Sequence, residues 1–324
     1  QMTLAIFWLL AFSGATHDIA SDGFYMLGLK QHEQAAYVGI RSTFFRLSMI
    51  AGQGALVFLA GKLTEMTGKL TWAWSMVFFL LAGMFIALFV YHSCALPKPA
   101  NDTAKIEGGN VGKTFVAIFK KFVQKPGIAT VFAFLLLYRF AESQLVKIAP
   151  VFLLDGKEKG GLGLSTADVG IAYGTVGVIA LTVGGLLSAY LISKHGMKRW
   201  LWPMVLAINV PNAVYVYLAV TQPDNFYLVS TLVAIEQFGY GFGFTAYVLF
   251  MIMTATGTHQ TAHYAICTGF MALGMMLPGM WSGWLQTKLG YANFFIWICV
   301  ATIPSFFVTA LIKVDPSFGT KRDA

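Results

Sequence analysis

Charged side chains inside long apolar stretches are the residues of this chain whose types and positions could do chemistry. Moving a charged side chain to the centre of a bilayer costs about 3 kcal/mol on insertion scales, so such residues face a partner or a water-filled cavity. They are typical of transport pathways. The seven residues of this kind are Asp18, Asp22, Arg46, Arg139, Glu142, Lys147 and Glu236.

Two carboxylates and one guanidinium of this set are predicted to meet at one depth. Arg139 and Glu142 are three residues apart, so they share a face of a helix, and Lys147 follows on the same span. At 1.5 Å per residue, Glu142 lies about 23 Å and Glu236 about 25 Å from one end of their spans. Burial favours a protonated carboxyl group, whereas a neighbouring guanidinium favours the ionised form. The group is suited to proton coupling, with an ion pair between Glu236 and Arg139 as the structural alternative.

A second group lies earlier in the chain. Asp18 and Asp22 are four residues apart and share a helix face, with His17 beside it. Asp18 lies about 15 Å and Arg46 about 14 Å from the ends of their spans, so an ion pair between them is expected. The pair either joins two helices or acts as a gate. His17 is either a hydrogen-bonded packing residue or a proton relay.

Polar and aromatic residues offer contacts for a solute. Asn209 and Asn212 flank Pro211, which is expected to kink its span. Gly239 and Gly243 predict close helix approach, and the alternative is a helix that bends during gating. Tyrosines stack on sugar rings and offer a hydroxyl group. The tyrosines expected to line a cavity are Tyr138, Tyr173, Tyr240 and Tyr247, with Tyr240 the first candidate for a sugar contact.

Composition indicates the elements that must position these residues. Hydrophobic residues make up 57% of the chain and charged residues only 11%, whereas charged residues are about a quarter of a soluble domain. Long apolar runs predict an all-α membrane protein rather than a barrel. The net charge of +8 fits basic loops on one side of a membrane, so no nucleic acid is expected as a partner. Cys94, Cys267 and Cys299 form no metal or disulfide pattern, and no metal or cofactor is expected.

Apolar windows of about 20 residues predict nine membrane spans. A first group of three ends near residue 94, a linker covers 95–126, six further spans cover 127–313, and a tail covers 314–324. The linker ends in an amphipathic stretch, 111–123, that predicts a helix lying in the membrane interface. The predicted spans are 2–28, 37–61, 71–94, 127–154, 165–193, 199–220, 225–253, 260–287 and 291–313.

The loops indicate an orientation. If the linker is cytoplasmic, that side holds fourteen Lys and Arg residues against five on the other side. Because cytoplasmic loops are enriched in these residues, the linker and the tail are predicted to be cytoplasmic and Gln1 to be on the outer side.

An internal repeat accounts for the odd number of spans. Gly61, Leu63 and Gly68 recur 222 residues later as Gly283, Leu285 and Gly290. The first three spans then match the last three, so we expect a two-half transporter whose first three helices are not in this chain. A further motif, Ser193-Lys-His-Gly196-Met-Lys-Arg199, resembles the loop signature of the major facilitators, with Ser193 in place of its acidic residue.

The motifs resemble those of one branch of that superfamily. The segments SGATHDIASDGFYMLGL and GIRSTFFRLSMIAGQG between residues 13 and 54, LYRFAES at 137–143 and AIEQFGYGFG at 234–243 are similar to segments of the AmpG-type muropeptide permeases. The resemblance covers nearly the whole chain, as helices four to twelve of a twelve-helix bundle. His17 and Gly23-Phe24 depart from the family pattern.

The resemblance implies import of cell-wall fragments, an amino-sugar disaccharide carrying a short peptide, driven by the proton gradient of the bacterial inner membrane. It matches Asp18, Asp22, Arg46, Arg139, Glu142 and Glu236 to ionisable positions of the family. Lys147 and Arg139 are expected to attract carboxylates of the solute, and the transporter is expected to work as a monomer. The alternatives are a carrier of another sugar, peptide or coenzyme-like anion, and, in another class, a membrane receptor or a membrane-embedded enzyme.

Overall fold

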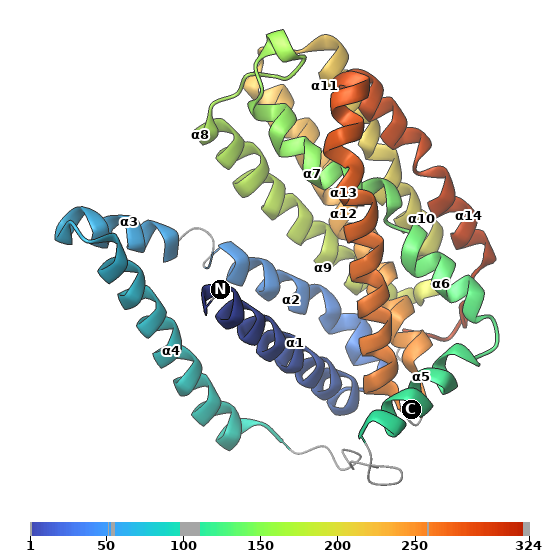
Figure 1. Ribbon diagram of the computed structural model, residues 1–324. Helices are drawn as coiled ribbons and strands as arrows, with labels where there is room; N and C mark the ends of the chain where they lie inside the picture. Colours follow the sequence, from blue (N-terminus) through green and yellow to red (C-terminus); the bar gives the residue numbers. More distant parts are fainter. Residues whose placement is uncertain (1, 51, 53–55, 98–110, 258, 320–324) are drawn as a thin grey trace. The chain divides into compact units, whose positions relative to one another are not determined.

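The computed structural model describes residues 2–50, 52, 56–97, 111–257 and 259–319, and the regular elements of these residues are helices (Figure 1). The chain divides into two compact units. The larger unit comprises Gln1–Ile40 with Lys105–Ala324, and the smaller comprises Arg41–Ala104.

The smaller unit contains the end of α2 (Gln31–Ile50), α3 (Leu56–Thr67) and α4 (Leu70–Ala95). The predicted span 37–61 is shared between α2 and α3, and residues 51 and 53–55 between these helices lie outside the described part. Between α3 and α4 the chain turns at Gly68, whose φ is +66°. A left-handed φ of this kind favours glycine.

The larger unit begins with α1 (Met2–Gly28) and continues after the linker with α5 (Val111–Val123). Its remaining helices form the second half of the chain, where most of the buried side chains lie. They are α6 (Ile128–Leu137), α7 (Phe140–Leu154), η3 (Lys157–Lys159), α8 (Thr166–Val169), η4 (Gly170–Gly177), α9 (Val178–His195), α10 (Met197–Asn209), η5 (Val210–Asn212), α11 (Ala213–Thr221), α12 (Phe226–Ala255), α13 (Gln260–Val300) and α14 (Ile303–Leu311).

Seven segments of the described residues are long and apolar enough to cross a membrane, so the predicted number of nine is not confirmed. Two predicted spans, 260–287 and 291–313, fall within the one segment Gln260–Leu311. This segment is broken at Gly290, where φ is +73° and ψ is 166°. The predicted span 37–61 is not among the seven, because α2 carries polar residues such as Glu33 and Arg41 and α3 has only 12 residues.

Local backbone geometry agrees with the internal repeat. Gly68 and Gly290, which the repeat makes equivalent, both have a positive φ at the junction of two helices. The signature-like loop is a tight turn in which Gly196, with φ +81°, separates α9 from α10. The sequence therefore identified these turns correctly.

Three interruptions lie within the membrane segments of the second half. Residues Tyr138 and Arg139 separate α6 from α7, and Arg139 has the non-helical angles φ −107° and ψ 21°. The segment η4 is π-helical, a form that is frequent at functional sites. The 3-10 turn η5 at Pro211 separates α10 from α11, as the sequence predicted. Pro278, by contrast, lies within α13, where the backbone keeps helical angles.

Close contacts of glycine fix α12 between α9 and α10. A Cβ atom on Gly241 would lie 2.0 Å from the Leu181 carbonyl oxygen of α9, and one on Gly239 would lie 2.0 Å from the Ala207 carbonyl oxygen of α10. The helix is continuous over its 30 residues. Close helix approach at these glycines is therefore confirmed, and bending during gating stays a prediction.

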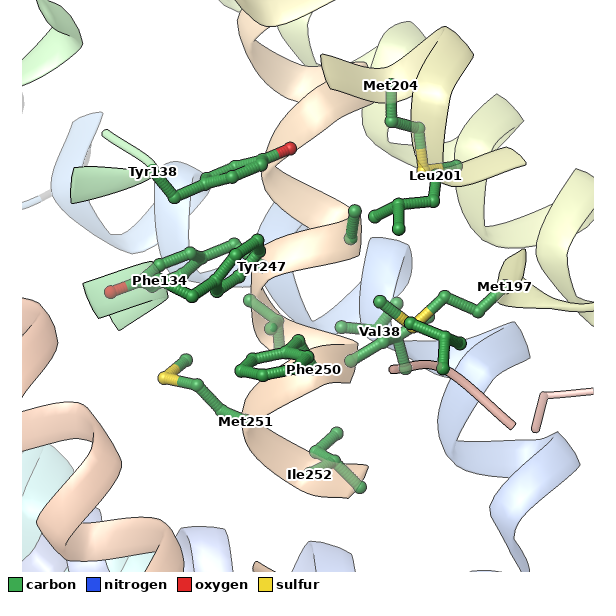
Figure 2. Packing of buried hydrophobic residues seen from close by; sticks show 14 of the residues in the cluster. Val38, Phe134, Tyr138, Met197, Leu201, Met204, Tyr247, Phe250, Met251 and Ile252 are labelled. Atoms are coloured by element: carbon green, nitrogen blue, oxygen red, sulfur yellow. The ribbon is translucent and has the colours of Figure 1, made fainter. Parts of the chain in front are cut away.

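Two tyrosines join α6 to α12 in the buried core (Figure 2). The Tyr138 hydroxyl donates to the Gly243 carbonyl oxygen at 2.9 Å, and the Tyr247 hydroxyl donates to the Leu135 carbonyl oxygen at 2.6 Å. Both rings are almost completely buried and lie 5.4 Å apart. The prediction that Tyr138 and Tyr247 line a cavity is therefore wrong, since both are packing residues.

The first helices of the chain touch the second half at one end of the larger unit. A Cβ on Gly23 of α1 would lie 2.6 Å from the Thr261 side chain of α13, and Gln260 Nε2 donates to the Met26 carbonyl oxygen at 3.0 Å. A Cβ on Gly39 of α2 would lie 2.7 Å from the Gly185 carbonyl oxygen of α9. The Gly39 contact needs glycine because two backbones approach closely there, whereas a Cβ on Gly23 would meet a side chain.

Candidate functional site

Glu236 lies in the middle of α12 and is 3% exposed. Its Oε2 atom accepts hydrogen bonds from the Tyr215 hydroxyl of α11 at 3.3 Å and from Gln237 Nε2 at 2.9 Å. No ion pair to Glu236 occurs among the described residues. The structural alternative, an ion pair with Arg139, is thus not observed, and Glu236 is a buried carboxyl group held by neutral donors.

Glu142 is the charged residue that acts electrostatically on Glu236. It is 4% exposed and lies in the first turn of α7, where the helix dipole favours negative charge. The Tyr173 side chain, on the π-helical segment η4, interacts with both carboxyl groups and with Tyr240. Two buried carboxyl groups near each other disfavour a second negative charge, so one of them can hold a proton.

The side chain of Arg139 contacts two aromatic residues, Tyr240 and Phe244. Its Nη2 atom donates to the Tyr240 hydroxyl at 2.5 Å, and its guanidinium carbon lies 5.1 Å from the Tyr240 ring centroid and 4.8 Å from that of Phe244. The Nε atom is buried without a hydrogen-bond partner among the described residues. The helix breaks at Tyr138-Arg139 and starts again at Phe140, so Arg139 is the residue before α7, and a shared helix face with Glu142 stays a prediction.

The other candidate site residues of the second half are Lys147, Asn209 and Asn212. Lys147 is exposed on α7, and its methylene chain lies beside Gly279 of α13, so it is not part of the buried group. Asn209 Nδ2 donates to the Val205 carbonyl oxygen and to Ser305 Oγ of α14, which makes Asn209 a packing residue. Asn212 is 1% exposed, and both polar atoms of its amide have no hydrogen-bond partner among the described residues.

The residues of the first group are only partly described. Asp22 is buried near the end of α1, whereas His17 and Asp18 are exposed one turn earlier. The side chain of Arg46 lies outside the described residues, and Arg46 belongs to the smaller unit. The ion pair between Asp18 and Arg46 therefore stays a prediction.

Sequence reasoning missed Tyr215, which contributes a hydroxyl donor to Glu236. The signal was available, because Tyr215 stands in the apolar run Ala213–Thr221 and a buried tyrosine hydroxyl needs a partner. Tyr173 was expected to line a cavity, and it interacts electrostatically with the two carboxyl groups and with Tyr240. In the described part of the chain, no group of three His, Cys, Asp or Glu residues could hold a metal ion.

The chain is similar to a known family and to individual known proteins. Residues 2–265 match the sequence profile of the Major Facilitator Superfamily. The anhydromuropeptide permease of Escherichia coli strain K12 is 23% identical over 316 residues, which are 97% of this chain and 61% of that protein. An uncharacterized protein of Haemophilus influenzae is 26% identical over 310 residues, which are 90% of this chain and 67% of that protein. The chain thus spans about three fifths of the length of the Escherichia coli relative.

Proposed function

The chain belongs to the Major Facilitator Superfamily of membrane transporters, and from this premise we propose that it acts in proton-coupled import of a polar solute across the bacterial inner membrane. The observation that carries the proposal is the buried carboxyl group of Glu236. It is held by Tyr215 and Gln237 and lies within electrostatic range of Glu142. An ionisable residue within a membrane segment is by default a functional one.

Glu236 is the proton carrier in this proposal, and Glu142 is its charged partner. The first turn of α7 stabilises a negative charge on Glu142, whereas both hydrogen-bond donors of Glu236 are neutral. Because two adjacent buried carboxylates repel each other, Glu236 is the group that takes up the proton. Movement of α7 or η4 against α12 changes the distance between these groups and so releases it.

Arg139 recognises the solute in this proposal. Its guanidinium is oriented by the rings of Tyr240 and Phe244, and its Nε atom has no hydrogen-bond partner among the described residues. A guanidinium held in this way suits a carboxylate, which it binds through two parallel hydrogen bonds. The solute therefore carries at least one carboxylate.

The favoured solute is a muropeptide-like compound. The support is the name of the Escherichia coli relative, an anhydromuropeptide permease, together with the carboxylates and sugar rings of such a compound. Arg139 suits the carboxylates, and Tyr240 suits the sugar rings. Other sugars, peptides or coenzyme-like anions with a carboxylate are the competing solutes.

The test measures uptake of radiolabelled anhydromuropeptide by cells that express the protein. Glu236→Gln keeps the size of the side chain and removes its ability to carry a proton, so uptake at a fixed proton gradient is expected to fall at least tenfold. The matched control is Glu158→Gln, because Glu158 is exposed in η3 and outside the site.

Two results distinguish the parts of the proposal. Equal uptake by Glu236→Gln and the unaltered protein would remove Glu236 as the proton carrier. If unlabelled anhydromuropeptides did not compete for uptake, a muropeptide would be excluded as the solute. Another compound with a carboxylate would then be the solute.

A further inference from the structure

A cavity of about 670 Å³ lies where the chain passes from α5 into α6. This volume is within the range of small-molecule sites. The start of α6 and the ends of α12 and α14 form its walls, and one part of the lining is apolar while the other is polar. The apolar residues are Val131, Phe250, Met253, Leu311 and Ile312, and the polar ones include Lys125, Lys313, Thr130, Thr254 and Thr256.

The charges at this cavity are all positive. Lys125 and Lys313 line it, and no acidic side chain is among its lining residues. Lys125 Nζ donates to the carbonyl oxygens of Thr254 at 2.6 Å and Thr256 at 3.0 Å, which fixes its ammonium group at the end of α12. An ammonium group has three N–H donors, so one is left for a ligand.

Burial lowers the pKa of Lys125 from its ordinary value. A negative charge beside the ammonium group opposes this effect and favours the charged form. Lys313, by contrast, is exposed. The pair thus combines one fixed and one exposed cation, and both are complementary to an anion.

The neighbouring helix α5 places this cavity at the boundary between lipid and water. Its residues Phe115, Val116 and Phe119 are exposed, while Lys113 and Lys120 lie on another side of the helix. Helices with one apolar and one basic face lie in the membrane interface. Phe122 is fully buried and holds α5 to the larger unit, and Lys125 follows three residues later.

We propose that this cavity binds an anionic phospholipid. The phosphate of its headgroup lies between the ammonium groups of Lys125 and Lys313, and an acyl chain covers the apolar side formed by Val131 and Leu311. Basic pockets between membrane helices near the interface are suited to anionic headgroups, and the apolar wall distinguishes a lipid from a free anion. The proposal does not depend on the transported solute.

Native mass spectrometry of the detergent-purified protein tests the proposal by titration with phosphatidylglycerol and, separately, with phosphatidylcholine. We expect phosphatidylglycerol to bind more tightly. Lys313→Gln should lower its affinity about fivefold, the effect of one basic residue near an anionic headgroup. Lys125→Gln should act in the same direction. The matched control Lys288→Gln changes an exposed lysine at the far end of the first part of α13 and should have no effect.

Three results would overturn the proposal. They are equal affinity for the two lipids, an unchanged phosphatidylglycerol affinity in Lys313→Gln, and complete displacement of the lipid by an equal concentration of inorganic phosphate. The Lys313 variant decides the test because Lys313 is exposed, whereas Lys125 also stabilises the end of α12.

Discussion

Tyr215 is a neutral side chain that belongs to the site of the charged residues Glu142 and Glu236. Its buried hydroxyl donates to Glu236 Oε2, so Tyr215→Phe leaves that oxygen with Gln237 as its remaining observed donor. We expect the free energy of unfolding to fall by about 1 kcal/mol, the usual contribution of one hydrogen bond, and solute uptake to fall as well. Thermal unfolding in detergent and an uptake assay measure the two effects.

The control for this substitution is Tyr217→Phe on the same helix. Tyr217 is exposed, so removal of its hydroxyl should change neither stability nor uptake. Identical behaviour of Tyr215→Phe and Tyr217→Phe would contradict the assigned role of Tyr215.

Residue types predicted which carboxyl groups would be buried but not which partners they would find. Glu142 and Glu236 lie near each other, as their depths indicated. Arg139 does not bridge them, because its guanidinium contacts the Tyr240 hydroxyl and the Phe244 ring instead. A partner across two helices depends on tertiary packing, which side-chain spacing along one helix does not report.

At the scale of elements, α12 packs closely against α9 and α10. Gly241→Ala places a methyl group 2.0 Å from the Leu181 carbonyl oxygen, so α9 and α12 must separate. Overpacking of this kind costs about 1–3 kcal/mol, more than the roughly 1 kcal/mol by which alanine favours a helix over glycine. We expect a lower melting temperature in detergent.

Gly269→Ala in α13 is the matched control, because a Cβ there has no neighbouring atom within 4 Å. It should keep or raise the melting temperature. A melting temperature of Gly241→Ala as high as that of Gly269→Ala would show that α9 and α12 do not pack as described.

Helix interruptions were predictable only where proline or glycine marks them. Pro211 lacks an N–H group and predicted the break at η5, and the repeated glycines Gly68 and Gly290 marked turns. The break between α6 and α7 falls in LYRFAES, which contains neither residue, and the three glycines of η4 did not by themselves predict a π-helix. Both irregular segments border the two carboxyl groups, where tertiary packing overrides local preference.

At the scale of the whole molecule, we expect the contacts between α1 and α13 to open during transport. An ideal Cβ on Gly23 lies 3.5 Å from the Thr261 Cβ, a separation that suits a disulfide. In a background where serine replaces the native cysteines, Gly23→Cys with Thr261→Cys should cross-link on oxidation and lose uptake. Reduction should restore uptake.

The control pair is Gly23→Cys with Gly269→Cys, which should not cross-link because no neighbouring side chain lies near Gly269. Continued uptake by the cross-linked Gly23–Thr261 pair would show that these helices stay together during transport.

Proton influx on addition of solute is the most direct measure of the central claim, that a proton carried by Glu236 drives import. Proteoliposomes that contain the protein and an internal pH-sensitive dye receive purified anhydromuropeptide. We predict acidification of the interior with the unaltered protein and with Glu158→Gln, and none with Glu236→Gln. Solute uptake without acidification in the unaltered protein, or acidification that persists in Glu236→Gln, would contradict the claim.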